Sequence, residues 1–260
     1  SYLFLVLAVA LGTASNSFAK SAEGFTLWVP SIITAFTIVL CMYSLSHVMK
    51  VIPEPHPSRF SFALESSLST DVMDKLWEYI SSAKENPKAY NAELAGNLSS
   101  SLVLNDTDNW FFVNTLRHII GKYKEIFKKS TASNSRSISK NDIPYGLDRL
   151  WVNFQKQHEF NPMHNHSGVY SFVVFMKIPT DWREQHEIPF VKESNAPKAS
   201  DFEFVYTDIM GNIRQYAYHL DSSFEGIMLF FPAEMMHMVY PFYNCEEERI
   251  TISGNIVYDI

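Results

Sequence analysis

The stretch that decides the fold is Trp151–Gly168, which reads WVNFQKQHEFNPMHNHSG. It joins an aromatic and β-branched run to two histidines, His164 and His166, which are two positions apart. On extended backbone such residues point to the same side, so both imidazoles can face one ligand. A third histidine, His237, lies 71 residues after His166, and Arg249 follows 12 residues later at the start of another β-branched run. Because imidazole binds iron, copper, zinc and nickel, the three histidines are candidate metal ligands.

The sequence around this stretch has the period of β-strands. Runs rich in β-branched and aromatic residues continue from Leu150 to the end of the chain, with short turns between several of them. No long helical pattern separates them, so they predict an all-β sandwich or barrel over about residues 145–260. The predicted strands are Trp151–Lys156, Val169–Ile178, Phe202–Thr207, Gln215–Leu220, Gly226–Phe231, Met238–Phe242 and Ile250–Tyr258.

Helical patterns precede this β core. Ser69–Lys84 begins with N-cap candidates and has an apolar face at helical spacing. Asp108–Lys129 repeats that pattern and has lysines near its end. The Ser/Asn-rich stretch Ser130–Asp142 predicts a surface loop. Inside the β core, Thr180–Ser200 is a long polar insertion, which we expect to act as a lid.

Residues 1–53 differ from the rest in charge. They contain only Lys20, Glu23 and Lys50 among Asp, Glu, Lys and Arg. Of the 21 basic and 28 acidic residues of the chain, 19 and 27 therefore remain after residue 53, a net charge of −8. A nucleic-acid binder usually presents a basic stripe, so no nucleic-acid partner is expected. The two cysteines, Cys41 and Cys245, exclude a disulfide framework and a cysteine zinc site.

The same residues predict membrane-spanning helices. Phe25–Met49 contains no charged residue and is long enough to cross a hydrocarbon layer of ~30 Å. The apolar segment Tyr2–Leu11 has two interpretations. It is either the first of two membrane helices or the apolar region of a signal peptide, with SFA at residues 17–19 as the cleavage site. The proline-rich stretch Glu54–Ser58 predicts a linker after the second helix.

Residues 1–53 also resemble a transporter family. The strings KSAEGFT at residues 20–26, VPSII at 29–33 and LSHVMKVIP at 45–53 are similar to the first two helices of the small multidrug resistance transporters. The resemblance ends where the third helix of that family would begin. The resemblance implies that the proton-coupling glutamate of that family is replaced by Gly12 in this chain. Because the membrane carboxylate is missing, transport by this chain alone is not expected. The segment is interpreted as a membrane anchor or as the remnant of a gene fusion.

The histidine and arginine pattern carries a second resemblance, over about residues 94–260. It is similar to the Fe(II)/2-oxoglutarate-dependent oxygenases, and most to the prolyl-hydroxylase-like branch of marine phages and bacteria. This resemblance implies a double-stranded β-helix of the cupin or jelly-roll kind, with N-terminal supporting helices. It also implies iron ligands, an arginine for the distal carboxylate of 2-oxoglutarate, and two further contacts to this cosubstrate. By position these are His164, His166 and His237 for iron, Arg249 for the carboxylate, and Thr251 and Asn153 for the further contacts.

One residue departs from the family pattern. The common iron triad has Asp or Glu where this sequence has His166, so the site has one negative charge fewer. The third ligand could therefore be His166, Glu159 or water. The resemblance gives no role to His158, His186 or His219, which are expected to be surface or supporting residues.

The expected activity is that of a dioxygenase that uses Fe(II), 2-oxoglutarate and O₂. It hydroxylates a small-molecule or peptide substrate and releases succinate and CO₂. The alternatives are a non-catalytic or zinc-binding cupin-like module, which would not need Arg249, and a membrane transport or scaffold role. The expected domains are a membrane hairpin over 1–53, a linker over 54–58 and the oxygenase domain over 59–260. The catalytic domain would be cytoplasmic, anchored through residues 1–53 or free if these are a fusion remnant. The oligomeric state is left open.

Overall fold

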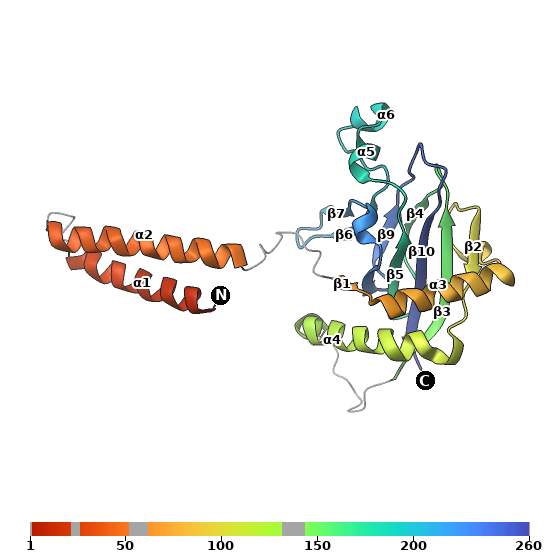
Figure 1. Ribbon diagram of the computed structural model, residues 1–260, viewed down its shortest axis with the longest axis horizontal. Helices are drawn as coiled ribbons and strands as arrows, with labels where there is room; N and C mark the ends of the chain where they lie inside the picture. Colours follow the sequence, from red (N-terminus) through yellow and green to blue (C-terminus); the bar gives the residue numbers. More distant parts are fainter. Residues whose placement is uncertain (1, 22–26, 52–61, 132–143, 260) are drawn as a thin grey trace. The chain divides into compact units, whose positions relative to one another are not determined.

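The computed structural model describes residues 2–21, 27–51, 62–131 and 144–259 (Figure 1). The chain divides into two compact units, Ser1–Ser61 and Phe62–Ile260. The linker predicted over residues 54–58 lies outside the described residues, as does most of the loop predicted over residues 130–142.

The N-terminal unit is a pair of helices that pack against one another, α1 (Tyr2–Ser21) and α2 (Trp28–Val51). Gly12 of α1 lies beside Cys41 of α2, since a Cβ added to the glycine would be 3.7 Å from the sulfur. A membrane span needs length and apolarity together, about 20 predominantly apolar residues. Within the described parts of the chain, no helix meets both requirements. The expected transmembrane helices, and the anchoring based on them, are therefore not supported.

The second unit is mainly β, as the sequence predicts, and contains two antiparallel sheets (Figure 1). The larger has the strand order β1-β8-β5-β10-β3-β2, and the smaller has the order β4-β9-β6-β7. All seven predicted strands are present, together with three short ones of four residues each. The strands are β1 (Leu64–Ser67), β2 (Ser100–Val103), β3 (Tyr145–Gln155), β4 (Asn161–His164), β5 (Tyr170–Lys177), β6 (Phe202–Thr207), β7 (Ile213–Tyr218), β8 (Ile227–Pro232), β9 (Met236–Val239) and β10 (Arg249–Tyr258).

Two helices, α3 (Thr70–Glu85) and α4 (Arg117–Thr131), cover one face of the larger sheet (Figure 1). Alternate residues of its strands enter this core, as the two-residue period of a strand requires. The residues of β3 and β10 that enter the core are apolar, and the residues that alternate with them along each strand face the smaller sheet. The core members from these elements include Leu76, Ile80, Ile120, Tyr123, Val152, Phe154, Ile250 and Ile252.

The segment predicted as one helix over residues 108–129 is broken near its start. A 3₁₀ turn, η2 (Thr107–Asn109), and a π turn, η3 (Phe112–Leu116), precede α4. The carboxylate of Asp106 accepts hydrogen bonds from the backbone N–H groups of Phe111 and Phe112 at 2.8 and 2.9 Å. Asp106 therefore satisfies backbone donors that a longer helix would have bonded internally, and Asp108 has a left-handed φ of 58°.

The strand predicted over residues 238–242 is also shorter, because β9 ends at Val239. Pro241 has no N–H with which to continue the ladder. Its carbonyl and that of Phe242 instead accept hydrogen bonds from the backbone N–H groups of Ser200 and His158.

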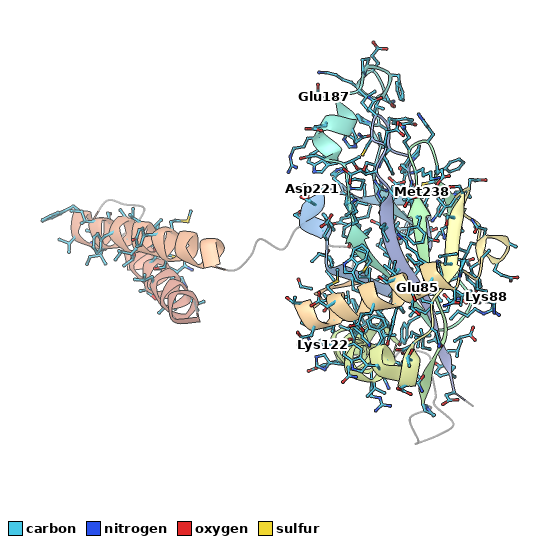
Figure 2. All side chains as sticks on the ribbon, turned by 45° about the vertical axis from the view of Figure 1, so that its right-hand side comes forward. Glu85, Lys88, Lys122, Glu187, Asp221 and Met238 are labelled. Atoms are coloured by element: carbon cyan, nitrogen blue, oxygen red, sulfur yellow. The ribbon has the colours of Figure 1, made fainter. Side chains whose placement is uncertain are left out.

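The insertion over Thr180–Ser200 is ordered by two short helices, α5 (Trp182–His186) and α6 (Pro189–Lys192). Two further 3₁₀ turns lie outside it, η1 (Asn91–Glu93) and η4 (Ser222–Phe224). Figure 2 labels Glu187 at the end of α5 and Asp221 immediately before η4.

Candidate active site

A cavity of about 230 Å³ lies on the face of the larger sheet opposite the helices. The register pairs Arg249 with Gln155, Thr251 with Asn153, and Ser253 with Trp151 across β10 and β3. All six line the cavity, because alternate residues of paired strands share a face. The apolar residues between them face the helical core. Because alternate residues of β3 and β10 point to opposite sides of the sheet, these two strands have the polar cavity on one side and the apolar core on the other.

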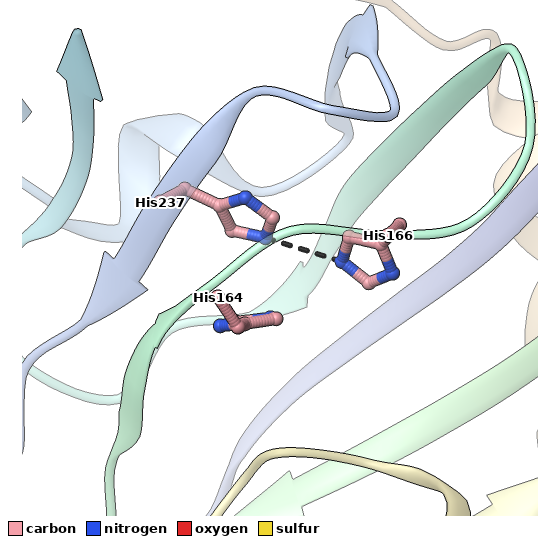
Figure 3. A group of neighbouring side chains, drawn as sticks. All are labelled: His164, His166 and His237. Carbon is pink, nitrogen blue, oxygen red and sulfur yellow. Dashed lines mark hydrogen bonds between the residues drawn. The ribbon is translucent and has the colours of Figure 1, made fainter.

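Three histidines line the same cavity. Figure 3 shows their rings close to one another. His164 of β4 and His237 of β9 are direct partners in an antiparallel pair, so their side chains lie next to each other on one face. His166 follows β4, and its backbone N–H donates to the carbonyl of Ala233 at 2.8 Å. Nitrogen atoms of the three rings lie within 4.8 Å of one another, and Nε2 of His166 is 3.2 Å from Nε2 of His237.

Backbone carbonyls orient two of the three imidazoles. Nδ1 of His164 lies 2.7 Å from the carbonyl of Pro162, and Nδ1 of His237 lies 2.9 Å from that of Met235. A carbonyl can only accept, so each Nδ1 carries the proton and donates. Each Nε2 then has a free lone pair, which is the form that binds a metal.

Burial keeps these imidazoles neutral. Loss of hydration, together with the neighbouring His164, lowers the pKa of His166 to about 4. The pKa of His164 falls for the same reason, and that of the deeply buried His237 falls well below its usual value. Neutral imidazole is the ligand form, so at neutral pH the three rings are ready to bind a cation.

Arg249 is the most unusual residue of the cavity wall. Its side chain is fully buried, and burial lowers the pKa of its guanidinium to about 10, so it is still charged at neutral pH. Its Nη2 donates to the carbonyl of Ser200 at 2.9 Å and also to the Ser200 hydroxyl, and its Nη1 donates weakly to Gln155 at 3.4 Å. Its Nε has no partner in the described structure. A buried charged donor without an acceptor is costly, so the site favours an anion at this position.

The other two predicted contact residues lie beside Arg249. Thr251 is the next residue of β10 on the cavity face, and Asn153 is its partner on β3. The hydroxyl of Ser101 donates to Oδ1 of Asn153 at 2.8 Å, which fixes the orientation of the amide. The structure therefore brings all six predicted site residues to one cavity.

Sequence reasoning missed several parts of the site. Ser200 and Gln155 hold the guanidinium of Arg249, although the sequence placed Ser200 at the end of a polar insertion. Trp151 stacks on His166 with ring centroids 5.6 Å apart, and Phe202 stacks on His237 at the same distance. Alternation along Trp151–Gln155 was a signal that could have identified Gln155. Nothing local indicated Ser200 or Phe202, which reach the site only through the fold.

No residue of Thr180–Ser200 lines the cavity in this structure, and the role of this segment as a lid stays a prediction. The segment Glu93–Leu98, which follows η1, supplies that part of the wall. A Cβ on Gly96 would lie 2.2 Å from Oδ1 of Asn161, so a larger residue there would displace the Asn161 side chain. The physical reason is that α5 and α6 make their own contacts: Gln185, for example, exchanges two hydrogen bonds with the backbone of Tyr243.

The structure places Glu159 away from the histidines. Its two carboxylate oxygens accept from the backbone N–H groups of Ser99 and Lys156, each at 2.9 Å. His158 packs edge-on against Tyr243 and is also outside the group. His186 and His219 instead form a separate group with Asp201. Of the residues that the sequence offered as a third ligand, His166 is the one beside His164 and His237.

Comparison with curated proteins gives matches over a short part of the chain. The quaternary ammonium compound-resistance protein QacC of Staphylococcus aureus is 35% identical over 52 residues, which are 20% of this chain and 49% of that protein. QacH of Staphylococcus saprophyticus is also 35% identical over 52 residues, with the same shares. The chain thus spans about half the length of the curated relatives that it matches. This agrees in part with the resemblance to small multidrug resistance transporters.

Solved structures are similar at low sequence identity. A prolyl-4-hydroxylase of Pseudomonas putida is 11% identical, with a TM-score of 0.43, and the match covers 76% of this chain and 93% of that one. HygX of Streptomyces hygroscopicus, solved with nickel, 2-oxoglutarate and hygromycin B, is 8% identical, with a TM-score of 0.45 and shares of 76% and 83%. Similarity at this level does not assign a function.

The family comparison covers the segment that contains the cavity. Residues 149–255 match the model of the family described as "Putative 2OG-Fe(II) oxygenase". The matched segment includes the three histidines, Arg249, Thr251 and Asn153. The site fits the group that this family binds, since three imidazoles with ring nitrogens within 4.8 Å of one another lie in the same cavity as a buried arginine whose Nε has no partner. The match over residues 149–255 therefore supports a 2OG-Fe(II) oxygenase, whose cofactors are Fe(II), 2-oxoglutarate and O₂.

Proposed function

We propose that this protein is an Fe(II)- and 2-oxoglutarate-dependent dioxygenase with a double-stranded β-helix core in the unit Phe62–Ile260. It hydroxylates a C–H bond of its substrate. One oxygen atom of O₂ enters the new hydroxyl group, the other enters succinate, and C1 of 2-oxoglutarate leaves as CO₂. The observation that supports this most strongly is the cavity itself, where three neutral imidazoles lie near a fully buried arginine.

His164, His166 and His237 would hold the iron. Iron bound by three facial ligands supplies the activation of O₂ and leaves three positions for a 2-oxo acid and O₂. The protein contributes the orientation of the imidazoles. The carbonyls of Pro162 and Met235 hold two of the rings so that Nε2 is presented to the cavity. Trp151 and Phe202 pack against ring faces and limit the rotation of His166 and His237.

Arg249 would bind the distal carboxylate of 2-oxoglutarate. The Nε that now has no acceptor gives a donor for one carboxylate oxygen, and charge-assisted hydrogen bonds of this kind are about twice as strong as neutral ones. The Thr251 hydroxyl and the amide nitrogen of Asn153 are further donors on the same wall. Burial of the arginine away from water strengthens its attraction for the carboxylate.

The substrate would enter past the segment Glu93–Leu98, which lines the cavity. A small molecule or one side chain of a peptide fits a volume of about 230 Å³. An acidic surface, with a net charge of −7 for the whole chain, disfavours nucleic acid as the substrate.

The test is a titration of the full chain with Fe(II) and 2-oxoglutarate under anaerobic conditions, followed by addition of O₂. We expect a metal-to-ligand charge-transfer band in the visible range that needs both Fe(II) and 2-oxoglutarate. Release of succinate should then depend on O₂. In Arg249→Ala the metal should still bind while the band and the succinate are lost at the same 2-oxoglutarate concentration. Equal succinate release by Arg249→Ala and the unmodified chain would contradict the proposal and favour a cupin-like metal-binding module.

A further inference from the structure

A second group of metal-ligating side chains lies outside the cavity. His186 at the end of α5, Asp201 just before β6 and His219 just after β7 come together from three separate segments. Nδ1 of His219 lies 3.0 Å from Oδ1 of Asp201, and Nε2 of His186 lies 3.3 Å from the same oxygen. All three ligand atoms are within 4.8 Å of one another.

This group is not satisfied by its own hydrogen bonds. The side chain of Asp201 is completely buried, yet its Oδ2 has no hydrogen-bond partner. Nε2 of His186 is also buried without a partner, since its approach to Asp201 does not have hydrogen-bond geometry. A buried carboxylate oxygen and a buried ring nitrogen without partners are both costly. A cation bound by the carboxylate of Asp201 and by Nε2 of His186 would compensate both groups.

The surrounding residues hold the group in place. Trp182 stacks on His219 with centroids 4.8 Å apart and meets His186 edge-on at 5.4 Å. Arg183 of α5 forms an ion pair at 2.9 Å with Asp221, which Figure 2 labels next to η4. The ligands are therefore presented by packed elements rather than by free side chains, as a metal site requires.

We propose that His186, Asp201 and His219 form a second metal site, which binds a divalent cation of the zinc class. Two imidazoles and one carboxylate are a donor set of this class, and bonds of about 2.0–2.2 Å in tetrahedral geometry place ligand atoms about 3.3–3.6 Å apart. The separations from Oδ1 of Asp201, 3.0 Å to Nδ1 of His219 and 3.3 Å to Nε2 of His186, lie at or slightly below the lower end of this range. The side chain of His219 is 44% exposed, so water can complete the coordination.

The site also has a consequence for the cavity, and this part rests on the proposed function. Asp201 directly follows Ser200, whose carbonyl and hydroxyl accept hydrogen bonds from Nη2 of Arg249. A cation bound to Asp201 would hold Ser200, and through it the arginine that we assign to 2-oxoglutarate.

The test separates the two sites. In full-length His164→Ala/His237→Ala, which lacks the first site, we expect an equimolar amount of Zn²⁺ after dialysis, measured by mass spectrometry of the metal. Added Zn²⁺ should raise the melting temperature of this variant, because binding to the folded state stabilises it. A further His219→Ala substitution should remove both effects. His118→Ala, which changes an exposed histidine of α4, should remove neither.

A second measurement avoids the double variant. The otherwise unmodified chain should bind one more equivalent of Zn²⁺ than His219→Ala does. When both proteins are loaded with Co²⁺ instead, His219→Ala should lack the visible absorption that the second site contributes. No zinc in His164→Ala/His237→Ala that is still folded by circular dichroism would overturn the proposal. Equal zinc content of the unmodified chain and His219→Ala would also overturn it. Neither readout needs oxygenase activity, so a failure here is distinct from a failure of the proposed function.

Discussion

The two histidine groups of this protein differ in donors and in surroundings. The first consists of His164, His166 and His237 and contains no carboxylate, whereas His186 and His219 are joined by Asp201. By donor set alone, the second group is the nearer to the two-histidine, one-carboxylate triad of iron oxygenases. Nevertheless, the first group lines the 230 Å³ cavity and the second group does not.

The difference shows that ligand identity is a weaker guide to an oxygenase centre than the neighbourhood of the ligands. The first group shares its cavity with a buried arginine that has a free donor, so a metal and an anionic cosubstrate can be bound together. At the second group the carboxylate lies between the two rings, and Arg183, beside His186 on α5, pairs with Asp221. We expect chemistry at the first group and a structural role for the second.

The largest effect is expected from His164→Ala or His237→Ala. Each removes an imidazole that a backbone carbonyl already holds in the binding orientation, and the group has no fourth ligand side chain among the described residues that could replace it. Iron bound in the presence of 2-oxoglutarate, and succinate release, should fall by at least about two orders of magnitude. His219→Ala should keep most of its iron binding and most of its succinate release. The reverse result, with iron chemistry lost in His219→Ala and retained in His164→Ala, would exchange the roles of the two groups.

Arg249→Ala should have the next largest effect, on the cosubstrate rather than on the metal. Losing charge-assisted hydrogen bonds to a buried carboxylate costs on the order of 2–5 kcal/mol, so the KM for 2-oxoglutarate should rise about 30-fold or more. Arg249→Lys keeps the charge but not the planar fork of donors, so its KM for 2-oxoglutarate should lie between those of the unmodified chain and Arg249→Ala. An unchanged KM for 2-oxoglutarate in Arg249→Ala would show that Arg249 does not bind the cosubstrate. The first histidine group would then no longer differ from the second in having a cosubstrate site beside it.

His166 allows a smaller and more specific test. A carboxylate completes the two-histidine facial triad of non-heme iron oxygenases, so His166→Asp should retain iron and turnover while His166→Ala loses part of both. Its ring is positioned by the stacked Trp151 rather than by a carbonyl, so its loss should be less severe than that of His164. Iron affinity could be compared by competition with a chelator. If His166→Ala were as damaging as His164→Ala and Asp could not substitute, the third ligand would be strictly an imidazole.

Much of the β unit could be predicted from residue order, for a physical reason. Alternation along Trp151–Gln155 and Arg249–Ser253 reflects a sheet with one apolar face and one polar face, and this pattern is local. The short strands β1, β2 and β4 have only four residues each, too few to show a period. Ser200 escaped notice because its role depends on Arg249, 49 residues away, and on its left-handed φ of 72°. The second histidine group has no local spacing at all, since its members come from three segments.

The smallest effect is expected from removal of the N-terminal unit. All six residues of the two groups lie in Phe62–Ile260, which forms a compact unit by itself. A chain of residues 58–260 keeps that unit whole, and compact units of this size usually fold alone. It should bind iron and zinc in the same amounts as the full chain, with turnover changed by less than about twofold. Circular dichroism would establish that it is folded, and metal content and succinate release would be measured side by side with the full chain. A folded chain of residues 58–260 that had lost iron but kept zinc would show that α1 and α2 support the first group and not the second, and the proposed boundary between the units would then be wrong.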